Sequence, residues 1–338
     1  MEEAPPSSLQ PLTPEAIRAL AATEGLTVLA VIPPPPPLDP AGLDQMLADG
    51  VGQLAYMEAN HDLRLRPDGM LPGAAALWCV AWSYQPELGC GTLKRARYAA
   101  GKDYHVILRA KLGRLGQRLG GRQRAFVDSA PANERTLAHL AGLGWIGRNA
   151  LIISPTAGSY RVLGFLLTSI PCATIHGGEE AHRCGSCTRC EVACPTKALV
   201  GGRVLTERCI SYLTIEYFGV IPRDLAASFD GWWMGCDRCQ EVCPWNRFAP
   251  EAADPRLTGR EEDETLLRIT AEDFDLHFAG RAVRRLGYVR FRRNLLVALF
   301  SRGNHALAAT FRDDALVADQ YRELYGDQPP PTSVTTSI

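Results

Sequence analysis

The sequence predicts an α+β protein in which a cysteine-rich module separates a mixed N-terminal domain from a short helical C-terminal segment. Three observations lead to this prediction. Apolar runs of strand length alternate with helical stretches over residues 1–172. Eight of the eleven cysteines lie between residues 184 and 243. Helical spacing of apolar residues returns from Leu266 onward.

The N-terminal part is expected to combine helices with short buried strands. Apolar stripes predict helices over Pro14–Glu24, Asp39–Asp49 and Asp103–Gly120. Apolar runs that include β-branched and aromatic residues predict strands over Leu26–Ile32, Leu77–Tyr84, Ala150–Ser154 and Arg161–Ile170. The prolines of Pro33–Pro37 form either a rigid extended spacer or a ligand for a proline-reading domain.

Two spaced cysteine runs define the central module. Cys184, Cys187, Cys190 and Cys194-Pro195 follow the C-x2-C-x2-C-x3-C-P pattern of two-cluster ferredoxins, whose fourth cysteine ligates the other cluster. The second run, Cys236, Cys239 and Cys243-Pro244, lacks its first cysteine, and Cys209 replaces it. One 4Fe–4S cluster is therefore expected on Cys184, Cys187, Cys190 and Cys243. The other is expected on Cys194, Cys209, Cys236 and Cys239.

Other uses of these cysteines fit the pattern less well. A structural zinc ion takes one set of four ligands and has no need for two C-x3-C-P endings. Disulfides require an oxidising compartment. The N-terminus has no signal-peptide pattern, and no apolar run approaches the ~18 residues of a membrane span, so a cytoplasmic protein without a membrane segment is expected.

The expected domain boundaries follow from these patterns. Residues 1–172 are expected to form the mixed N-terminal domain and residues 173–248 the ferredoxin-like module. The acidic stretch Glu251–Glu264 is expected to be a linker within a helical segment that covers residues 249–327, and residues 328–338 form a disordered tail.

Asp128 is the candidate acid. It follows the apolar pair Phe126-Val127 and precedes Ser-Ala-Pro131, which is typical of a turn or a helix cap. A carboxyl in an apolar pocket would instead have a raised pKa and could deliver a proton during a reduction. The residues alone leave both interpretations open.

Together, the motifs resemble those of epoxyqueuosine reductases. They are Val127-Asp-Ser-Ala-Pro-Ala-Asn-Glu-Arg135, Leu143-Gly-Trp-Ile-Gly-Arg-Asn-Ala150, the two cysteine runs, and Cys209-Ile-Ser-Tyr-Leu-Thr-Ile-Glu216. The resemblance implies a nitroreductase-like cobalamin-binding domain joined to the two-cluster module. It also implies reduction of epoxyqueuosine to queuosine at the wobble position of tRNA anticodons, the last step of queuosine biosynthesis. Electrons would pass through two 4Fe–4S clusters to cobalamin, with Asp128 as proton donor.

The resemblance also suggests cofactor contacts. Met57, Tyr98, Asp128, Asn149, Ser154, Tyr160 and Ser211 lie in or near the family blocks, although each could equally serve plain packing. Asp103-Tyr-His105 imitates a cobalt-ligating signature, but leucine replaces its glycine, and we do not expect His105 to bind cobalt.

Two basic runs suggest an RNA partner. Residues 94–124 hold ten Lys or Arg and one acid, and residues 281–302 hold seven Arg and none. Such runs can bind phosphates or can simply be solvated helix faces. The candidate contacts to the tRNA anticodon loop are Lys111, Arg114, Arg118, Arg290, Arg292 and Arg293.

Two other functions remain as alternatives. A cobalamin-dependent reductive dehalogenase would normally carry an export signal and use a tyrosine as acid. A ferredoxin-type electron carrier would not need the 172 residues before the clusters. The expected enzyme is a monomer that takes electrons from a flavodoxin or ferredoxin system.

Overall fold

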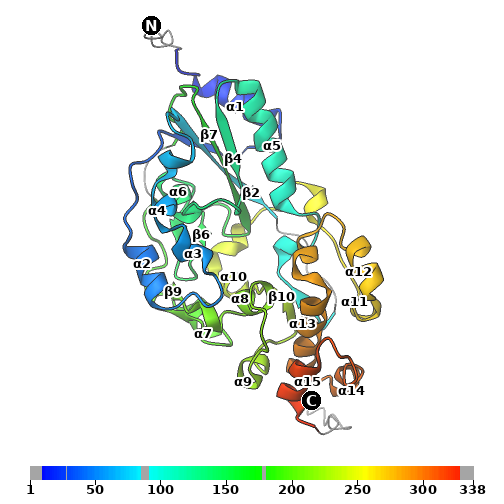
Figure 1. Cartoon of the computed structure of the whole chain (residues 1–338). Helices are drawn as coiled ribbons and strands as arrows, with labels where there is room; N and C mark the ends of the chain where they lie inside the picture. The colour runs from blue at the N-terminus through cyan, green and yellow to red at the C-terminus, as the bar shows by residue number, and fades with distance from the viewer. Residues whose placement is uncertain (1–9, 28, 85–90, 177–179, 328–338) are drawn as a thin grey trace.

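A four-stranded antiparallel sheet forms the centre of the N-terminal part. The computed structural model describes residues 10–27, 29–84, 91–176 and 180–327. In spatial order the strands are β1 (Leu29–Ile32), β2 (Ala76–Ser83), β7 (Arg161–Thr168) and β4 (Gln123–Phe126). All eight residues of β2 are buried, because helices cover both faces of the sheet (Figure 1). This mixture of helices and antiparallel strands confirms the predicted α+β class.

Alternating side chains on the strands supply two hydrophobic layers. On β2, Trp78 and Val80 face α1 (Pro14–Ala22) and α5 (Tyr104–Leu119). Leu77 and Cys79 face the opposite layer, which holds α2 (Ala41–Ala48), α4 (His61–Leu65) and α6 (Glu134–Leu140). The shorter α3 (Tyr56–Ala59) lies beside α4.

Helix α5 positions the first half of the site. Its N-cap Asp103 accepts a hydrogen bond from the backbone N–H of His105, as a capping aspartate should. Leu108, Leu112 and Leu115 are fully buried against the sheet. A Cβ on Gly164 of β7 would lie 2.8 Å from Leu108, so glycine there lets the helix approach closely. The helix predicted over residues 103–120 is confirmed.

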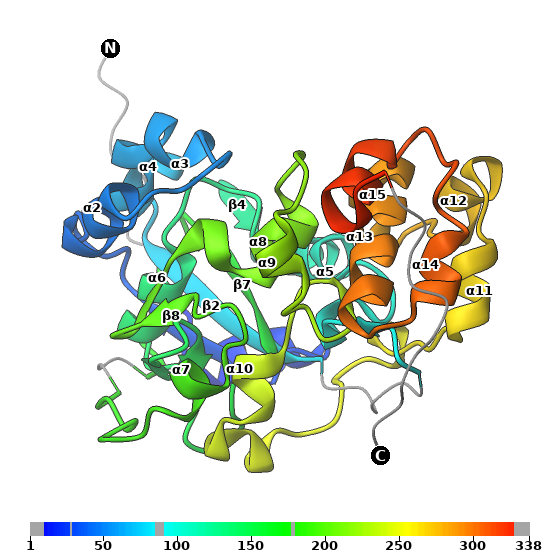
Figure 2. The same ribbon diagram turned by 90° about the horizontal axis from the view of Figure 1, so that it is seen from below.

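The cysteine-rich part consists of short elements around two loops. These are α7 (Arg189–Ala193), β8 (Leu199–Val200), β9 (Arg203–Val204), α8 (Ile210–Ile215), α9 (Arg223–Ala226), β10 (Trp232–Met234) and α10 (Arg238–Glu241). Strand β10 pairs in parallel with β3 (Lys94–Arg95), so this part of the chain is joined to the N-terminal part by a ladder. Figure 2 shows α7 and α10, which carry cysteines of both runs, side by side.

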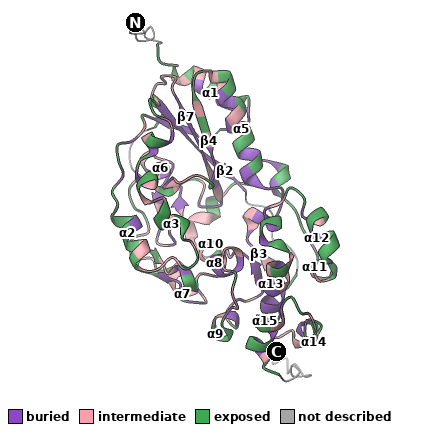
Figure 3. Cartoon of the chain, in the orientation of Figure 1, coloured by how far each residue is buried: buried purple, intermediate pink, exposed green. Residues whose placement is uncertain are grey.

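The C-terminal helices share one hydrophobic core with α8, α9 and β10. They are α11 (Asp263–Arg268), α12 (Ala271–His277), α13 (Gly287–Ser301), α14 (His305–Ala309) and α15 (Ala318–Tyr325). Trp233 and Phe291 stack edge to face at 5.5 Å in this core, and the buried side of α13 faces it (Figure 3). The core spans the expected boundary between residues 173–248 and 249–327, and that division stays a prediction.

Several expectations need adjustment. Residues 251–264 are not a free linker, because Leu257 is fully buried in the core beside α5. The strand predicted over Ala150–Ser154 is reduced to β6 (Ile152–Ile153), paired with β5 (Trp145–Ile146), because Ala150 has a φ of 60°. Residues 328–338, predicted to be disordered, and Cys90 lie outside the described residues.

Candidate active site

The first set of predicted cluster ligands lines a single pocket. Cys184, Cys187, Cys190 and Cys243 face it together with Arg148, Asn149, Arg189 and Trp245. All four thiols are partly exposed. Four thiolates around one space are the donor set of a 4Fe–4S cluster, so these residues fit that group.

The second predicted set lies deeper in the protein. Cys194 is buried with Ala198 and Leu199, and Cys209 and Cys239 pack against them. Burial raises the pKa of Cys236, and the neighbouring Cys209 and Cys194 raise it further. Four close thiols in an apolar setting also fit a 4Fe–4S cluster, which would release their protons on binding.

Asp128 lies where the sheet meets the start of α5. It follows β4 with a φ of 54°, a left-handed conformation that aspartate tolerates better than most residues. Its Oδ2 accepts a 2.9 Å hydrogen bond from the Tyr104 hydroxyl and lies 3.2 Å from His105 Nε2. Its backbone N–H donates a 2.6 Å bond to Glu134 Oε1 on α6. The Asp128 side chain remains 62% exposed, so a substrate can reach the acid.

Two further residues hold His105 in place. Asp103 Oδ1 lies 2.6 Å from His105 Nδ1. Arg285, on the 3-10 turn Ala282–Leu286, donates a 2.8 Å bond to Asp103 Oδ2, and its Nη1 lies 3.2 Å from His105 Nε2. The C-terminal segment therefore contributes a cation to a site that the N-terminal part builds.

The charges in this cluster depend on one another. Burial lowers the pKa of His105, but its bonds to Asp103 and Asp128 outweigh burial and the pKa is raised. Burial raises the pKa of Asp128, but the contacts with His105, Tyr104 and Arg285 together outweigh burial and the pKa is lowered. The surroundings of Asp128 are therefore polar and do not form the apolar pocket that would raise its pKa. Burial and the charge of Asp128 raise the pKa of Glu134 well above its ordinary value.

Sequence reasoning missed four members of this cluster and misjudged a fifth. Asp103, Tyr104, Glu134 and Arg285 were not singled out for the site, and His105 was considered only as a cobalt ligand. The Asp-Tyr-His run at a helix start and the glutamate six residues after Asp128 are the local signals that could have found all of them except Arg285. No local signal points to Arg285.

Tyrosines connect Asp128 to the deeper cysteine set. The ring of Tyr98 lies 5.8 Å from that of Tyr104 and 6.4 Å from that of Tyr84. Tyr84 lies 5.9 Å from Tyr160 and donates a 3.4 Å hydrogen bond to Gln240, the residue after Cys239. The wall between the acid and the cysteines is therefore aromatic.

The predicted cofactor contacts separate into two kinds. Tyr98 and Ser211 both border Gly235, where a Cβ would lie 3.5 and 3.6 Å from them. The Tyr160 hydroxyl and Asn149 Nδ2 are buried without a hydrogen-bond partner among the described residues. Such donors suit a macrocycle with amide side chains, so Tyr160 and Asn149 fit cobalamin. Met57 packs against the core near α4, and the Ser154 hydroxyl lies 3.3 Å from that of Thr156.

The predicted tRNA contacts lie on two faces. On α5, Lys111 donates to the backbone oxygen of Glu24, and Arg114 and Arg118 pair with its carboxylate at 2.8 and 3.3 Å. The side chains of Arg114 and Arg118 remain 52% and 46% exposed. On α13, Arg290 donates to backbone oxygens and covers the Phe218 ring at 4.1 Å.

Arg293 does not fit its predicted role. It is 5% exposed, and its guanidinium donates to the backbone oxygens of Leu213, Tyr217 and Gly219. It holds α13 to the cysteine-rich part and cannot meet a phosphate. Arg292 is 13% exposed and bonds to Asp314, which leaves little of it for RNA.

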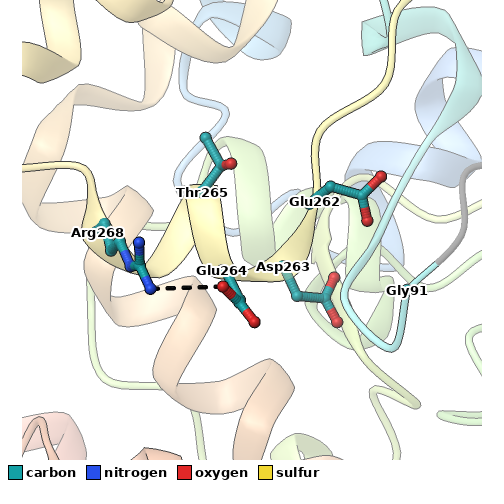
Figure 4. A pocket seen from close by; sticks show the side chains of 6 residues that line it. All are labelled: Gly91, Glu262, Asp263, Glu264, Thr265 and Arg268. Carbon is teal, nitrogen blue, oxygen red and sulfur yellow. Dashed lines mark hydrogen bonds and ion pairs between the residues drawn. The ribbon is translucent and has the colours of Figure 1, made fainter.

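A larger hollow lies elsewhere. It has a volume of about 590 Å³ and is lined by Gly91, Glu262, Asp263, Glu264, Thr265 and Arg268 (Figure 4). Asp263 bonds to the backbone N–H of Thr92, and Arg268 pairs with Glu264. None of the predicted site residues faces it.

Among the described helices, none combines the length and the apolar character needed to cross a bilayer.

Family models match two parts of the chain. One, described as "4Fe-4S double cluster binding domain", covers residues 183–246. The other, described as "Epoxyqueuosine reductase QueG", covers residues 64–129 and includes Asp128.

Relatives and solved structures match most of the chain. Epoxyqueuosine reductase of Vibrio cholerae is 38% identical over 267 residues, which cover 73% of this chain and 72% of the relative. That of Pseudomonas aeruginosa is 40% identical, with 73% and 74% covered. A selenomethionine-labelled epoxyqueuosine reductase matches with a TM-score of 0.78 and 26% identity over 93% of this chain and 88% of its own. An epoxyqueuosine reductase with a modified tRNA-Tyr stem loop matches with a TM-score of 0.76 and 26% identity, with 92% and 89% covered. The chain belongs to the epoxyqueuosine reductase family.

Proposed function

We propose that this protein reduces epoxyqueuosine in tRNA to queuosine. The observation that carries the proposal is the accessible acid, Asp128. Behind it, a row of tyrosines leads to eight cysteines in two sets of four. Removal of the epoxide oxygen as water needs two electrons and two protons. A proton-delivering group beside an electron-transfer module is the combination that this reaction requires.

The electrons enter through the first cysteine set. Cys184, Cys187, Cys190 and Cys243 line an open pocket, and Val192 beside them is 71% exposed. The deeper set lies between this pocket and the tyrosines. A one-electron carrier such as a flavodoxin or ferredoxin would deliver each electron at the outer set, and the inner set would pass it toward the substrate.

Cobalamin is the second cofactor of the proposal. Tyr98, Tyr160 and Ser211 would hold it beside the inner cysteine set, and Asn149 from the pocket of the first set, with Met57 and Ser154 farther away. When bound, cobalamin supplies a strongly reducing cobalt centre that clusters and side chains cannot provide.

Asp128 would act on the leaving oxygen. An alkoxide is a poor leaving group, and an acid held at that oxygen typically accelerates its departure 10²–10⁴-fold. The Tyr104 hydroxyl fixes the orientation of the carboxyl, and Glu134 fixes the backbone of the same residue. Both bonds aim the acid while leaving it exposed to the substrate.

The anticodon loop would approach over Phe218. This residue is 70% exposed, its ring is backed by Arg290, and its backbone N–H donates to Gln53. Burial and the charge of Glu216 raise the pKa of Tyr56, and the charge of Asp128 raises it further. An aromatic ring paired with a guanidinium can stack on an unpaired base beside the acid. Lys111, Arg114 and Arg118 would meet phosphates farther away.

The two alternatives have less support. A reductive dehalogenase or a ferredoxin-type carrier does not account for relatives that are 38% and 40% identical epoxyqueuosine reductases. We further propose that the enzyme works in the cytoplasm as a monomer, where its tRNA substrate and its electron carrier are found.

The test uses anaerobically reconstituted protein and epoxyqueuosine-containing tRNA. The wild type should hold about eight irons and one cobalt and should form queuosine. Asp128→Asn should keep the iron and the cobalt but lose about 10²–10⁴-fold in the single-turnover rate. Absence of queuosine with fully loaded wild type would refute the function. An active Asp128→Asn would remove Asp128 from it.

A further inference from the structure

Removal of the epoxide oxygen raises a question of proton supply. Two carbon–oxygen bonds break, two electrons enter, and two protons reach the same oxygen, which leaves as water. Asp128 carries at most one proton at a time. If it serves both transfers, it must be reloaded within the turnover, and this inference therefore rests on the proposed function.

The structure offers one suitable group. His105 Nε2 lies 3.2 Å from Asp128 Oδ2, the same oxygen that accepts from Tyr104. Its ring stacks on that of Tyr104 at 3.9 Å, which restricts its rotation. His105 is only 8% exposed, so bulk solvent reaches it mainly through the exposed edge of Asp128.

Two residues behind His105 hold its second nitrogen. Asp103 Oδ1 accepts from Nδ1–H at 2.6 Å, which leaves Nε2 as the nitrogen that faces Asp128. Arg285 donates to Asp103 Oδ2 and so fixes Asp103 from the other side. Its Nη1 lies 3.2 Å from Nε2 and can only donate, so this contact competes with a proton on Nε2. A carboxylate–imidazole pair that presents one nitrogen to a second group is a standard arrangement for proton transfer.

We propose that His105 is the proton store that loads Asp128 before each of the two transfers, with Asp103 and Arg285 as its positioning residues. At rest the proton lies on His105 Nε2, and Asp128 is ionised. As the first carbon–oxygen bond breaks, His105 Nε2 passes its proton to Asp128 Oδ2, and Asp128 passes a proton on to the oxygen. Water at the exposed edge of Asp128 restores the proton on His105, and the second transfer repeats the sequence.

The charges agree with this resting state. Burial opposes the charged form of His105, while Asp103 and Asp128 favour it, and the pKa is raised. Arg285 opposes the charge on His105 by its proximity and favours ionised Asp128, whose pKa is lowered. Glu134, on the far side of Asp128, has a pKa that burial and the charge of Asp128 raise, which opposes a second negative charge beside Asp128.

The first test measures the histidine directly. NMR titration of the loaded protein, with His105 assigned through His105→Gln, should give a His105 pKa above the ordinary ~6.5. In Asp128→Asn that pKa should fall, because the partner charge is removed. An unchanged His105 pKa in Asp128→Asn would overturn the relay, whatever the enzyme reduces.

The second test measures turnover. His105→Gln should lower the single-turnover rate by about 10²-fold, and imidazole in the buffer should restore part of it. The wild-type rate should fall as the pH rises through the His105 pKa. This falling limb of the pH–rate profile should be absent from His105→Gln. Arg285→Gln should shift the limb, whereas Arg284→Gln, whose side chain pairs with Asp275 on the surface, should not.

The outcomes separate the two proposals. A loaded wild type that does not reduce the tRNA removes the function, and with it the role of His105. If the wild type is active and His105→Gln is equally active with the same pH profile, only the relay is refuted. A rate decrease that imidazole and pH leave untouched would assign His105 a packing role and would also overturn it.

Discussion

At the scale of single residues, the Asp128 site is a set of opposed charges. Asp128 and His105 each favour the charged form of the other, and burial together with the charge of Asp128 raises the pKa of Glu134. In the proposed mechanism, an accessible carboxylate therefore needs no raised pKa of its own to deliver protons. The proton is available from a neighbour.

Glu134 gives a pH prediction. Because its pKa is raised in the folded protein, folding binds a proton, and the free energy of unfolding falls as the pH rises above the ordinary glutamate pKa. Glu134→Gln should remove this decrease and keep the acceptor for the Asp128 N–H. Its Tm should exceed that of the wild type by roughly 2–4 °C at pH 8 and by nothing at pH 4.

Calorimetry at both pH values checks this prediction. Glu264→Gln is the matched control, because its side chain is 84% exposed and the same charge change should leave the Tm unchanged. Equal stability of Glu134→Gln and wild type at pH 8 would mean that Glu134 is ionised in the folded protein.

At the scale of elements, the sequence predicts what local patterns determine. The stripe of Leu108, Leu112 and Leu115 predicts α5 with its boundaries, and the apolar run of β2 predicts the central strand. Strand β4 was missed, because Gln-Arg-Ala-Phe has little apolar character and pairs only at the sheet edge. Arg285 was missed because it meets Asp103 across 182 positions of sequence.

The arginines of α13 show the same limit. From sequence, residues 281–302 form one basic run, but the fold uses Arg293 and Arg290 to bond backbone oxygens of the preceding part. Charge can be counted from sequence, whereas burial of a particular guanidinium depends on which carbonyls the fold leaves unpaired near it.

Arg293→Lys tests this structural role. The single nitrogen of an ammonium cannot reach the oxygens that Nη1 and Nη2 bond from two positions, so the free energy of unfolding should fall by about 2–4 kcal/mol in urea titrations. Arg302→Lys, whose partner Asp230 is on the surface, should lower it by less than about 1 kcal/mol. If Arg293→Lys keeps its full stability but binds tRNA more weakly, Arg293 is a tRNA contact, as the sequence analysis predicts.

At the scale of the whole molecule, the site is assembled from all parts of the chain. The N-terminal part supplies Asp128 and His105, and in the proposed function the cysteine-rich part supplies electrons past Gln240, which bonds to Tyr84. The C-terminal segment supplies Arg285 and shares its core with the cysteine-rich part. An error in docking any of these parts would therefore disturb proton and electron delivery together.

The outer face of α5 gives the last prediction. Three cations there face the single carboxylate of Glu24, which leaves a net positive surface that RNA phosphates can approach. Arg114→Gln combined with Arg118→Gln should weaken tRNA binding at low salt. Each phosphate that the double variant no longer neutralises should reduce the slope of log K against log salt by about 0.7–0.9. Arg268→Gln on α11, 81% exposed and paired with Glu264, is the control with the same kind of charge change. An unchanged salt slope in the double variant would mean that this face is merely solvated and that the RNA backbone is bound elsewhere, nearer to Arg290.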